Sequence, residues 1–179
     1  MSDMTRVAIL GATGSIGSSA LSVIRLHPDR FKLVGLSAWH QAEALAALVG
    51  ELSPHIAAVS MEHVDAFRAQ CRGTGVDVTL LGGSAGLKAV AEYPRADTVV
   101  AGISGAAGLE SIFAAVRAGK RILIANKEPL VMCGRLLRKE ARRSGAGLLP
   151  IDSEHNAIFQ CLPEALQQRV ANGFGVGGT

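Results

Sequence analysis

The chain has 179 residues, 49% of them hydrophobic, and a formal net charge of +3. This length and composition suit a soluble protein with one well-buried core and room for the start of a second unit. Its apolar runs are interrupted by glycine or charge well before the ~20 residues that a membrane-spanning helix needs, so we expect no membrane segment.

The N-terminus, the cysteines and the basic residues exclude further classes of protein. The N-terminus lacks the basic region, long apolar region and cleavage site of a secretory signal, so we expect a cytoplasmic protein. Cys71, Cys133 and Cys161 form no CxxC pair, which argues against a disulfide framework or zinc knuckle and predicts buried thiols. The isoelectric point near 9.0 favours anionic partners, but the densest basic run, residues 135–143, contains no aromatic side chain. A solvated helix face explains that run better than contact with nucleic acid.

Short apolar runs typical of strands recur along the chain. They span residues 6–11, 31–38, 56–59, 76–81, 97–102, 121–126 and 147–152. Between most of them, apolar residues at three- and four-residue spacing predict amphipathic helices. This alternation indicates an α/β fold of the Rossmann type, a doubly wound, mostly parallel sheet with helices on both faces. The end of the chain, residues 167–179, finishes in a Gly-rich stretch without periodicity and is predicted to be disordered.

The first motif, "GATGSIG", places Gly11, Gly14 and Gly17 between the first strand and a helix that begins near Ser15. Glycines in such a turn let the backbone approach a pyrophosphate closely, and the helix start directs N–H groups and its positive dipole end at the anion. The spacing GxxGxxG is a variant of the GxGxxG of dinucleotide-binding proteins, in the strand, turn and helix context that the motif requires. The alternative is a tight turn without a ligand.

The end of the second strand favours NADP over NAD. NAD-selective sites place an acid there to bind the ribose 2′-hydroxyl. Here residues 37–41 read SAWHQ, and the first acid is Glu43. The serine hydroxyl, the His40 imidazole and the Gln41 amide could surround a 2′-phosphate without repelling it. For Trp39 and His40 the alternative is an ordinary surface turn.

A second motif, "IANKEPLV", ends a strand in Asn126, Lys127 and Glu128, with Pro129 in the first turn of the next helix. Polar groups at the carboxyl end of a parallel strand face the ligand crevice, which makes Lys127 a candidate for holding a substrate or phosphate oxygen. The alternative is a plain helix start with Lys127 solvated and Glu128 favourable at the dipole.

The third motif, "LLPIDSEHNAIFQ", follows the last strand. If that strand extends through Glu154, its period of two puts Asp152 and Glu154 on one side and Ser153 on the other. Two convergent carboxylates suit Mg²⁺ or Mn²⁺. The alternative is a capped helix start, with Asp152 or Ser153 as the N-cap and Glu154 in the first turn.

These motifs, in this order, resemble the 1-deoxy-D-xylulose-5-phosphate reductoisomerase family. The resemblance runs from about Val7 to about Pro163 and includes the stretches "HPDRFKLVGLSA" and "GAAGLESIFAAVRAGK". The resemblance implies an NADPH-binding Rossmann-type domain at 1–150 and the start of a catalytic, metal-binding domain at 151–166. It implies a homodimeric enzyme of non-mevalonate isoprenoid biosynthesis. That enzyme rearranges and reduces the sugar phosphate 1-deoxy-D-xylulose 5-phosphate to 2-C-methyl-D-erythritol 4-phosphate.

The resemblance also implies roles for single residues. It assigns substrate contacts to Lys127, Ser153 and Glu154, and a divalent metal, Mg²⁺ or Mn²⁺, to Asp152 and Glu154. The NADPH contacts that it implies are Thr13, Gly14, Ser15, Ile16, Asn126 and Glu128. The glycine turn and the second strand end add Gly11, Gly17, His40 and Gln41 to the predicted cofactor site.

The sequence departs from the family in three places. The family commonly has Gly, then Lys or Arg, then Asn where this chain has Trp39, His40 and Gln41, and "NKES" is here "NKEP". The family continues into a phosphate-binding stretch, a third carboxylate ligand, a flap and a helical domain that this sequence lacks, so we expect an incomplete fragment that is inactive alone. One alternative is an NADP-binding remnant or sensor module. Another is a semialdehyde-type dehydrogenase, which would need a nucleophilic cysteine in its own setting; the position of Cys133 in a predicted helix speaks against it.

Overall fold

The computed structural model describes residues 4–171, which form one seven-stranded sheet with parallel pairing throughout. The strands are β1 (Thr5–Leu10), β2 (Phe31–Ser37), β3 (Ile56–Val59), β4 (Thr79–Gly82), β5 (Thr98–Ala101), β6 (Arg121–Ile124) and β7 (Gly147–Pro150). The helices are α1 (Ser15–Leu26), α2 (Ala42–Leu52), α3 (Val64–Arg72), α4 (Gly83–Ala91), α5 (Leu109–Arg117), α6 (Glu128–Ser144), α7 (Ser153–Gln160) and α8 (Glu164–Ala171). Two short 3-10 helices, η1 (Met61–His63) and η2 (Gly105–Gly108), precede α3 and α5.

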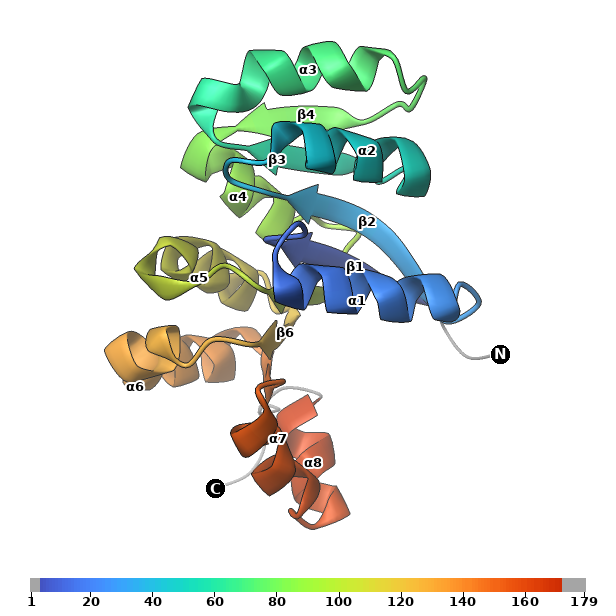
Figure 1. Cartoon of the computed structure of the whole chain (residues 1–179). Coiled ribbons are helices and arrows are strands. Elements are labelled where there is room, and N and C mark those ends of the chain that lie inside the picture. The colour runs from blue at the N-terminus through green and yellow to red at the C-terminus, as the bar shows by residue number, and fades with distance from the viewer. Residues whose placement is uncertain (1–3, 172–179) are drawn as a thin grey trace.

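The strand order is β4-β3-β2-β1-β5-β6-β7, so the chain starts in the middle of the sheet. It winds outward to β4, returns to β5 beside β1, and then winds the other way (Figure 1). The predicted Rossmann-type, doubly wound fold is therefore confirmed. In such a sheet ligands bind at the carboxyl ends of the strands where the winding direction reverses, which here is between β1 and β5.

Helices cover both faces of the sheet because each strand is apolar on both sides. In β1, Val7 and Ile9 belong to one core cluster, whereas Ala8 and Leu10 belong to the other. The first cluster includes buried side chains of α1, α2 and α3, and the second includes buried side chains of α4, α5 and α6. The period-two alternation of one central strand thus fills two separate cores.

One face of the sheet is covered unevenly. An apolar groove of about 610 Å³ lies between α1, which contributes Ile16 and Val23, and the strands of the second half. Val100, Leu123 and Leu149 line its other side, and the last two are only partly buried. The first half of the sheet, by contrast, has its α1-to-α3 core closed over β1 to β3.

Several predictions made from the sequence are wrong at the level of single residues. The fourth strand begins at Thr79 rather than at residue 76, and the last strand ends at Pro150 rather than at residue 152. Residues 164–171 form α8, which corrects the disordered end predicted from residue 167; residues 172–179 lie outside the described part. Cys71 is buried as expected, but Cys133 is half-buried and Cys161 is exposed. Among residues 4–171, no helix is long and apolar enough to cross a membrane.

Candidate functional site

The turn after β1 is built on two glycines that tolerate no side chain. Gly11 has a φ of +79°, and a Cβ there would lie 2.9 Å from the carbonyl oxygen of Gly102. A Cβ on Gly17 would lie 2.3 Å from the carbonyl oxygen of Gly11. The buried Ser37 at the end of β2 fixes the same turn, because its main-chain oxygen accepts the Ala12 N–H at 2.7 Å. These glycines are required by packing whether or not a ligand is bound.

Gly14 differs from its two neighbours in the motif. Its φ is −82°, and the nearest atom to a Cβ would be the Gly11 carbonyl oxygen at 3.4 Å, so the fold itself tolerates a small side chain. Gly14 is the N-cap of α1, which has no side-chain cap and no acidic residue in its first turn. The first N–H groups of a helix have no partner within it, so this end of α1 offers donors and a positive dipole end to an anion.

A cavity of about 240 Å³ adjoins this turn. Its lining is mostly apolar and comes from the segments that follow β1, β2, β4 and β5. The lining residues are Gly11, Thr13, Ser37, Ala38, Trp39, Ser84, Leu87, Ile103 and Ala107. Sequence reasoning identified the glycine turn and the end of β2 but missed Ser84, Leu87, Ile103 and Ala107. The signal was present, since each of these residues follows a predicted strand and parallel strands end at the same edge.

The end of β2 is arranged differently from the prediction. Ser37 is fully buried and its hydroxyl accepts the Gly11 N–H at 3.3 Å, so it supports the turn as well as lining the cavity. His40 and Gln41 are exposed, and Gln41 is the N-cap of α2. The sequence offers no acid before Glu43, but the fold brings Glu62 of η1 to 3.8 Å from the His40 ring. This contact joins two loops and is invisible in the sequence.

The strand β6 ends in the second motif. The Asn126 side chain donates a hydrogen bond of 2.8 Å to the carbonyl oxygen of Ile103, which ties the ends of β5 and β6 together. Lys127 and Glu128 are exposed at the start of α6, and Pro129 is buried in its first turn. The helix is kinked at Cys133, whose φ and ψ are −136° and 20°. Cys133 is thus a half-buried helix residue at a kink.

The third motif adopts the capped helix start and not the extended strand. Asp152 is the N-cap of α7, with a φ of −70° and a ψ of 148°, and Ser153 is the first helical residue. Alternation along a strand therefore does not align Asp152 with Glu154. A hydrogen bond joins Asp152 to the His155 ring, and the Ser153 hydroxyl donates to Glu154 at 2.9 Å. The Asn156 side chain donates to the carbonyl oxygen of Pro150 at 2.9 Å and anchors α7 to β7.

Both carboxylates of this cluster are held in the ionised form. The hydrogen bond from His155 lowers the pKa of Asp152 below its ordinary value. The pKa of Glu154 is lowered first by a main-chain hydrogen bond at the helix start, then by the Ser153 hydroxyl, and also by the positive charge of Lys127. Lys127 of the second motif thus lies close enough to Glu154 of the third to favour its charged form.

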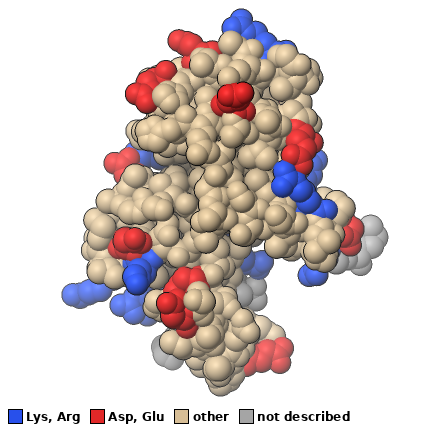
Figure 2. Space-filling view, viewed as in Figure 1, with Lys and Arg blue, Asp and Glu red and all other residues tan. Residues whose placement is uncertain are grey.

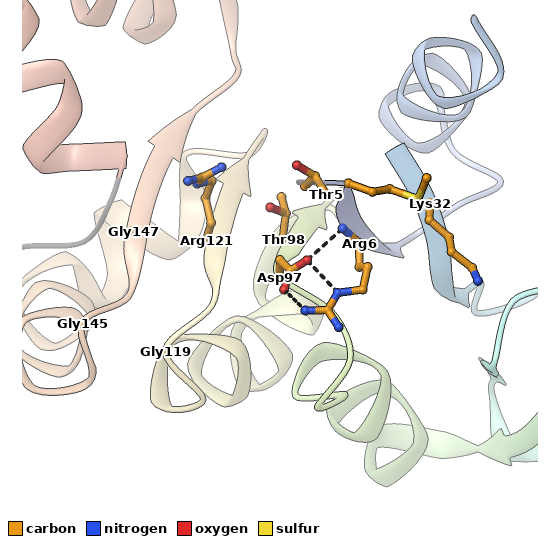
Figure 3. A pocket seen from close by; sticks show the side chains of 10 residues that line it. Thr5, Arg6, Lys32, Asp97, Thr98, Gly119, Arg121, Gly145 and Gly147 are labelled. Carbon is orange, nitrogen blue, oxygen red and sulfur yellow. Dashed lines mark hydrogen bonds and ion pairs between the residues drawn. The ribbon is translucent and has the colours of Figure 1, made fainter. Parts of the chain in front are cut away.

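Another cavity lies at the opposite edge of the sheet. It encloses about 650 Å³ at the amino ends of the strands, opposite the glycine turn, and contains none of the predicted site residues (Figure 3). Arg6 and Asp97 line it and form a two-point ion pair with distances of 2.6 and 2.9 Å (Figure 3). This pair joins β1 to the residue before β5, so its role in the described structure is to hold the centre of the sheet together.

The fold, with its glycine turn at the carboxyl edge of the sheet, defines a protein of the Rossmann type. The family model for 1-deoxy-D-xylulose 5-phosphate reductoisomerase matches residues 7–134. The chain therefore belongs to the 1-deoxy-D-xylulose 5-phosphate reductoisomerase family.

Individual relatives agree with this assignment. The reductoisomerase of Psychrobacter arcticus is 49% identical over 91% of this chain and 40% of its own length. A crystal structure of a reductoisomerase with NADPH, fosmidomycin and magnesium is 49% identical over 92% of this chain and 40% of its own, with a TM-score of 0.89. The Zymomonas mobilis enzyme in complex with NADPH is 37% identical over 91% of this chain and 42% of its own, with a TM-score of 0.85. The chain thus spans about two fifths of the length of these relatives.

Proposed function

We propose that this chain supplies the NADPH-binding part and the first metal ligands of a 1-deoxy-D-xylulose 5-phosphate reductoisomerase. The proposed reaction is the NADPH-dependent rearrangement and reduction of 1-deoxy-D-xylulose 5-phosphate to 2-C-methyl-D-erythritol 4-phosphate. The observation that carries the proposal is the uncapped, acid-free start of α1 at Gly14, next to the 240 Å³ cavity. An anion-binding helix start beside an apolar cavity suits a pyrophosphate linked to a flat base.

The residues of the proposed cofactor site would contact different parts of NADPH. The helix start would hold the pyrophosphate through the main chain of Thr13, Gly14, Ser15 and Ile16, with Gly11 and Gly17 shaping the turn. His40 and Gln41 lie where the ribose 2′-phosphate of NADPH would be bound, and the base would occupy the cavity that Trp39 lines. Asn126 and Glu128 would lie toward the nicotinamide, because they follow β6, on the other side of the crossover between β1 and β5.

Asp152 and Glu154 fit a divalent metal of the Mg²⁺ or Mn²⁺ type. Both are ionised carboxylates, and hard cations of this kind take oxygen ligands. When bound, such a metal supplies a Lewis acid that stabilises negative charge on a substrate oxygen. The chain's own contribution is positioning: His155 holds Asp152, Ser153 holds Glu154, and Lys127 brings a positive charge for a substrate oxygen. In this proposal Lys127, Ser153 and Glu154 contact the substrate.

The remaining parts of the proposal concern organisation. We place the nucleotide-binding domain at 1–150 and the start of the catalytic domain at 151–166, since α7 is the first element after the last strand. We infer a cytoplasmic, homodimeric enzyme that acts on a small sugar phosphate and not on nucleic acid. Against nucleic acid, both basic and acidic side chains are scattered over the face seen in Figure 2.

A second candidate function is an NADP-binding module without catalysis. Ser153 and Glu154 are exposed, whereas the glycine turn is packed against β2 and β5. The nucleotide half of the site is thus more completely enclosed than the half that would perform the chemistry. Binding of NADPH without turnover would favour this module.

The test is a titration of NADPH and NADH followed by nicotinamide fluorescence. We expect at least tenfold tighter binding of NADPH (about 1.4 kcal/mol). Gly14→Val should abolish binding of both, because its side chain occupies the space that a pyrophosphate needs. Gly134→Val is the matched control, since a Cβ there meets nothing within 4 Å, and it should bind like the wild type. Equal affinity for both cofactors, or binding by the Gly14 variant, would contradict the proposal.

A further inference from the structure

A cluster of three potential metal ligands lies outside the proposed Mg²⁺ or Mn²⁺ site. It consists of His40, which follows β2, and of Glu62 and His63 in η1, which follows β3. One Glu62 carboxylate oxygen lies 3.8 Å from Nδ1 of His40 and 3.5 Å from Nδ1 of His63. One ligand atom from each of the three residues lies within 4.8 Å of the others.

The main chain holds the two loops of this cluster together. The Ser60 N–H donates to the carbonyl oxygen of Trp39 at 3.1 Å, so the residues just before Met61 and His40 are directly joined. Within the second loop the His63 N–H donates to the carbonyl oxygen of Ser60 at 3.2 Å. The two imidazole rings are 5.9 Å apart with an edge-to-face angle of 64°. Ligands that the backbone already brings together lose little further freedom when an ion binds.

The spacing suits an ion better than direct pairing. Hydrogen bonds between nitrogen and oxygen are about 2.7–3.2 Å long, so the carboxylate is too far from either ring for a good hydrogen bond. Two ligands at about 2.0–2.1 Å from a tetrahedral zinc ion lie about 3.3–3.4 Å apart. The separations of 3.5 and 3.8 Å from the Glu62 carboxylate are close to that value, and the ligand nitrogens of the two imidazoles lie within 4.8 Å of each other. A small movement of exposed side chains would close the remaining difference.

We propose that in the chain without NADPH, where His40 is not engaged by a 2′-phosphate, His40, Glu62 and His63 bind Zn²⁺, with water in the remaining coordination position. Two imidazoles and one carboxylate form a ligand set that zinc uses in proteins, with an open fourth position. Nitrogen ligands favour zinc and other late transition metals, whereas Mg²⁺ and Mn²⁺ prefer oxygen. The two metal sites of this chain would therefore select different ions, and they lie at the ends of different strands.

The test uses the whole chain and Co²⁺ as a spectroscopic substitute for Zn²⁺. Co²⁺ should produce visible absorption of a low-coordinate nitrogen and oxygen site, without a near-ultraviolet thiolate band from cysteine. Stoichiometric Zn²⁺ should remove the absorption, and a large excess of Mg²⁺ should leave it unchanged. No absorption, a thiolate band or displacement by Mg²⁺ would overturn the proposal.

Single substitutions assign the ligands. His63→Ala and Glu62→Gln should each weaken Zn²⁺ binding at least tenfold, measured by competition with a zinc indicator. His27→Ala, at the far end of α1, is the matched histidine control and should bind zinc like the wild type. Circular dichroism melting of each variant without metal separates loss of the site from loss of the fold. Unchanged zinc affinity in a folded His63 or Glu62 variant would exclude this ligand set.

Discussion

The two halves of the sheet differ in how completely they are built. Around β1 to β3, helices α1, α2 and α3 close a core on one face and α4 closes the other. Around β5 to β7, the side facing α1 is an apolar groove of about 610 Å³. The candidate site is divided in the same way. The glycine turn is fixed by buried main-chain contacts, whereas Asp152, Ser153 and Glu154 start a helix, α7, that has no buried residue.

This difference assigns separate tasks to the two halves. The proposed nucleotide cradle needs fixed main-chain donors, and the turn between β1 and α1 provides them where it packs against the ends of β2 and β5. Chemistry on a substrate needs groups held in a reactive geometry away from water, and the exposed start of α7 does not provide that by itself. If this division holds, the two halves should differ in behaviour as strongly as they do in packing.

The largest effect concerns turnover. We expect the 179-residue chain alone to oxidise no NADPH above a protein-free control in the presence of 1-deoxy-D-xylulose 5-phosphate and Mn²⁺. Correct placement of the reacting groups can lower the activation barrier by about 7–11 kcal/mol. Ser153 and Glu154 are exposed to solvent, so the chain alone does not hold the substrate in that placement. Absorbance at the NADPH band measures the rate. Robust turnover would show that the second half is complete as it stands.

The next effect concerns the stability of the half of the sheet that carries the glycine turn. Gly17→Ala should lower the free energy of unfolding by at least about 2 kcal/mol, because its Cβ would lie 2.3 Å from a main-chain oxygen that cannot easily move. Gly14→Ala should change it by less than about 1 kcal/mol, since its nearest neighbour is 3.4 Å away. Urea unfolding measures both. Similar losses for the two variants would mean that the turn is not fixed as described.

Binding of Mg²⁺ or Mn²⁺ in the second half should be weak and should depend on Asp152. Two carboxylates leave Mg²⁺ or Mn²⁺ mostly hydrated, so we expect weak Mn²⁺ affinity that falls at least fivefold in Asp152→Asn. Relaxation of water protons by Mn²⁺ measures this affinity. Asp97→Asn is the matched control, because Asp97 lies at the opposite edge of the sheet (Figure 3). Indistinguishable titrations of the wild type and the Asp152 variant would remove Asp152 from the metal site.

The smallest effect concerns the Arg6–Asp97 ion pair, which joins β1 in the first half of the sheet to the residue before β5 in the second. The hydrogen bonds from Arg6 lower the pKa of Asp97 in the folded protein, so the unfolded chain binds more protons near pH 4. The stabilisation is fully present above the ordinary aspartate pKa of about 3.9 and is lost as the pH falls through the lower folded value. Both side chains are more than 40% exposed, so we expect less than about 1 kcal/mol. Asp97→Asn should therefore unfold more readily than the wild type at pH 7, and the difference should shrink as the pH falls below about 3.9, measured with urea. A difference that stays constant as the pH falls would contradict this origin.

Much of the nucleotide half is determined by the sequence itself. Period-two alternation within strands and three- and four-residue spacing within helices are local properties, so the amino-acid sequence alone predicts the element order and the Rossmann-type fold. The glycine turn is predictable for the same reason, since strand, Gly11, Gly14, Gly17 and helix are adjacent in the chain. The roles proposed for Lys127, Asp152 and Glu154 come from family resemblance, because their local pattern fits a plain helix start equally well.

Only the tertiary structure decided which distant residues meet. The order of the strands brings Ser84 and Ile103 to the cavity beside Thr13, places Lys127 close enough to influence Glu154, and sets Glu62 between His40 and His63. The end of β7 was also decided there: the sequence allowed a strand through Glu154, but the chain turns at Asp152 to start α7, which Asn156 anchors to Pro150. Strand order and helix docking depend on how whole faces pack against each other, and no local pattern of side chains contains that information.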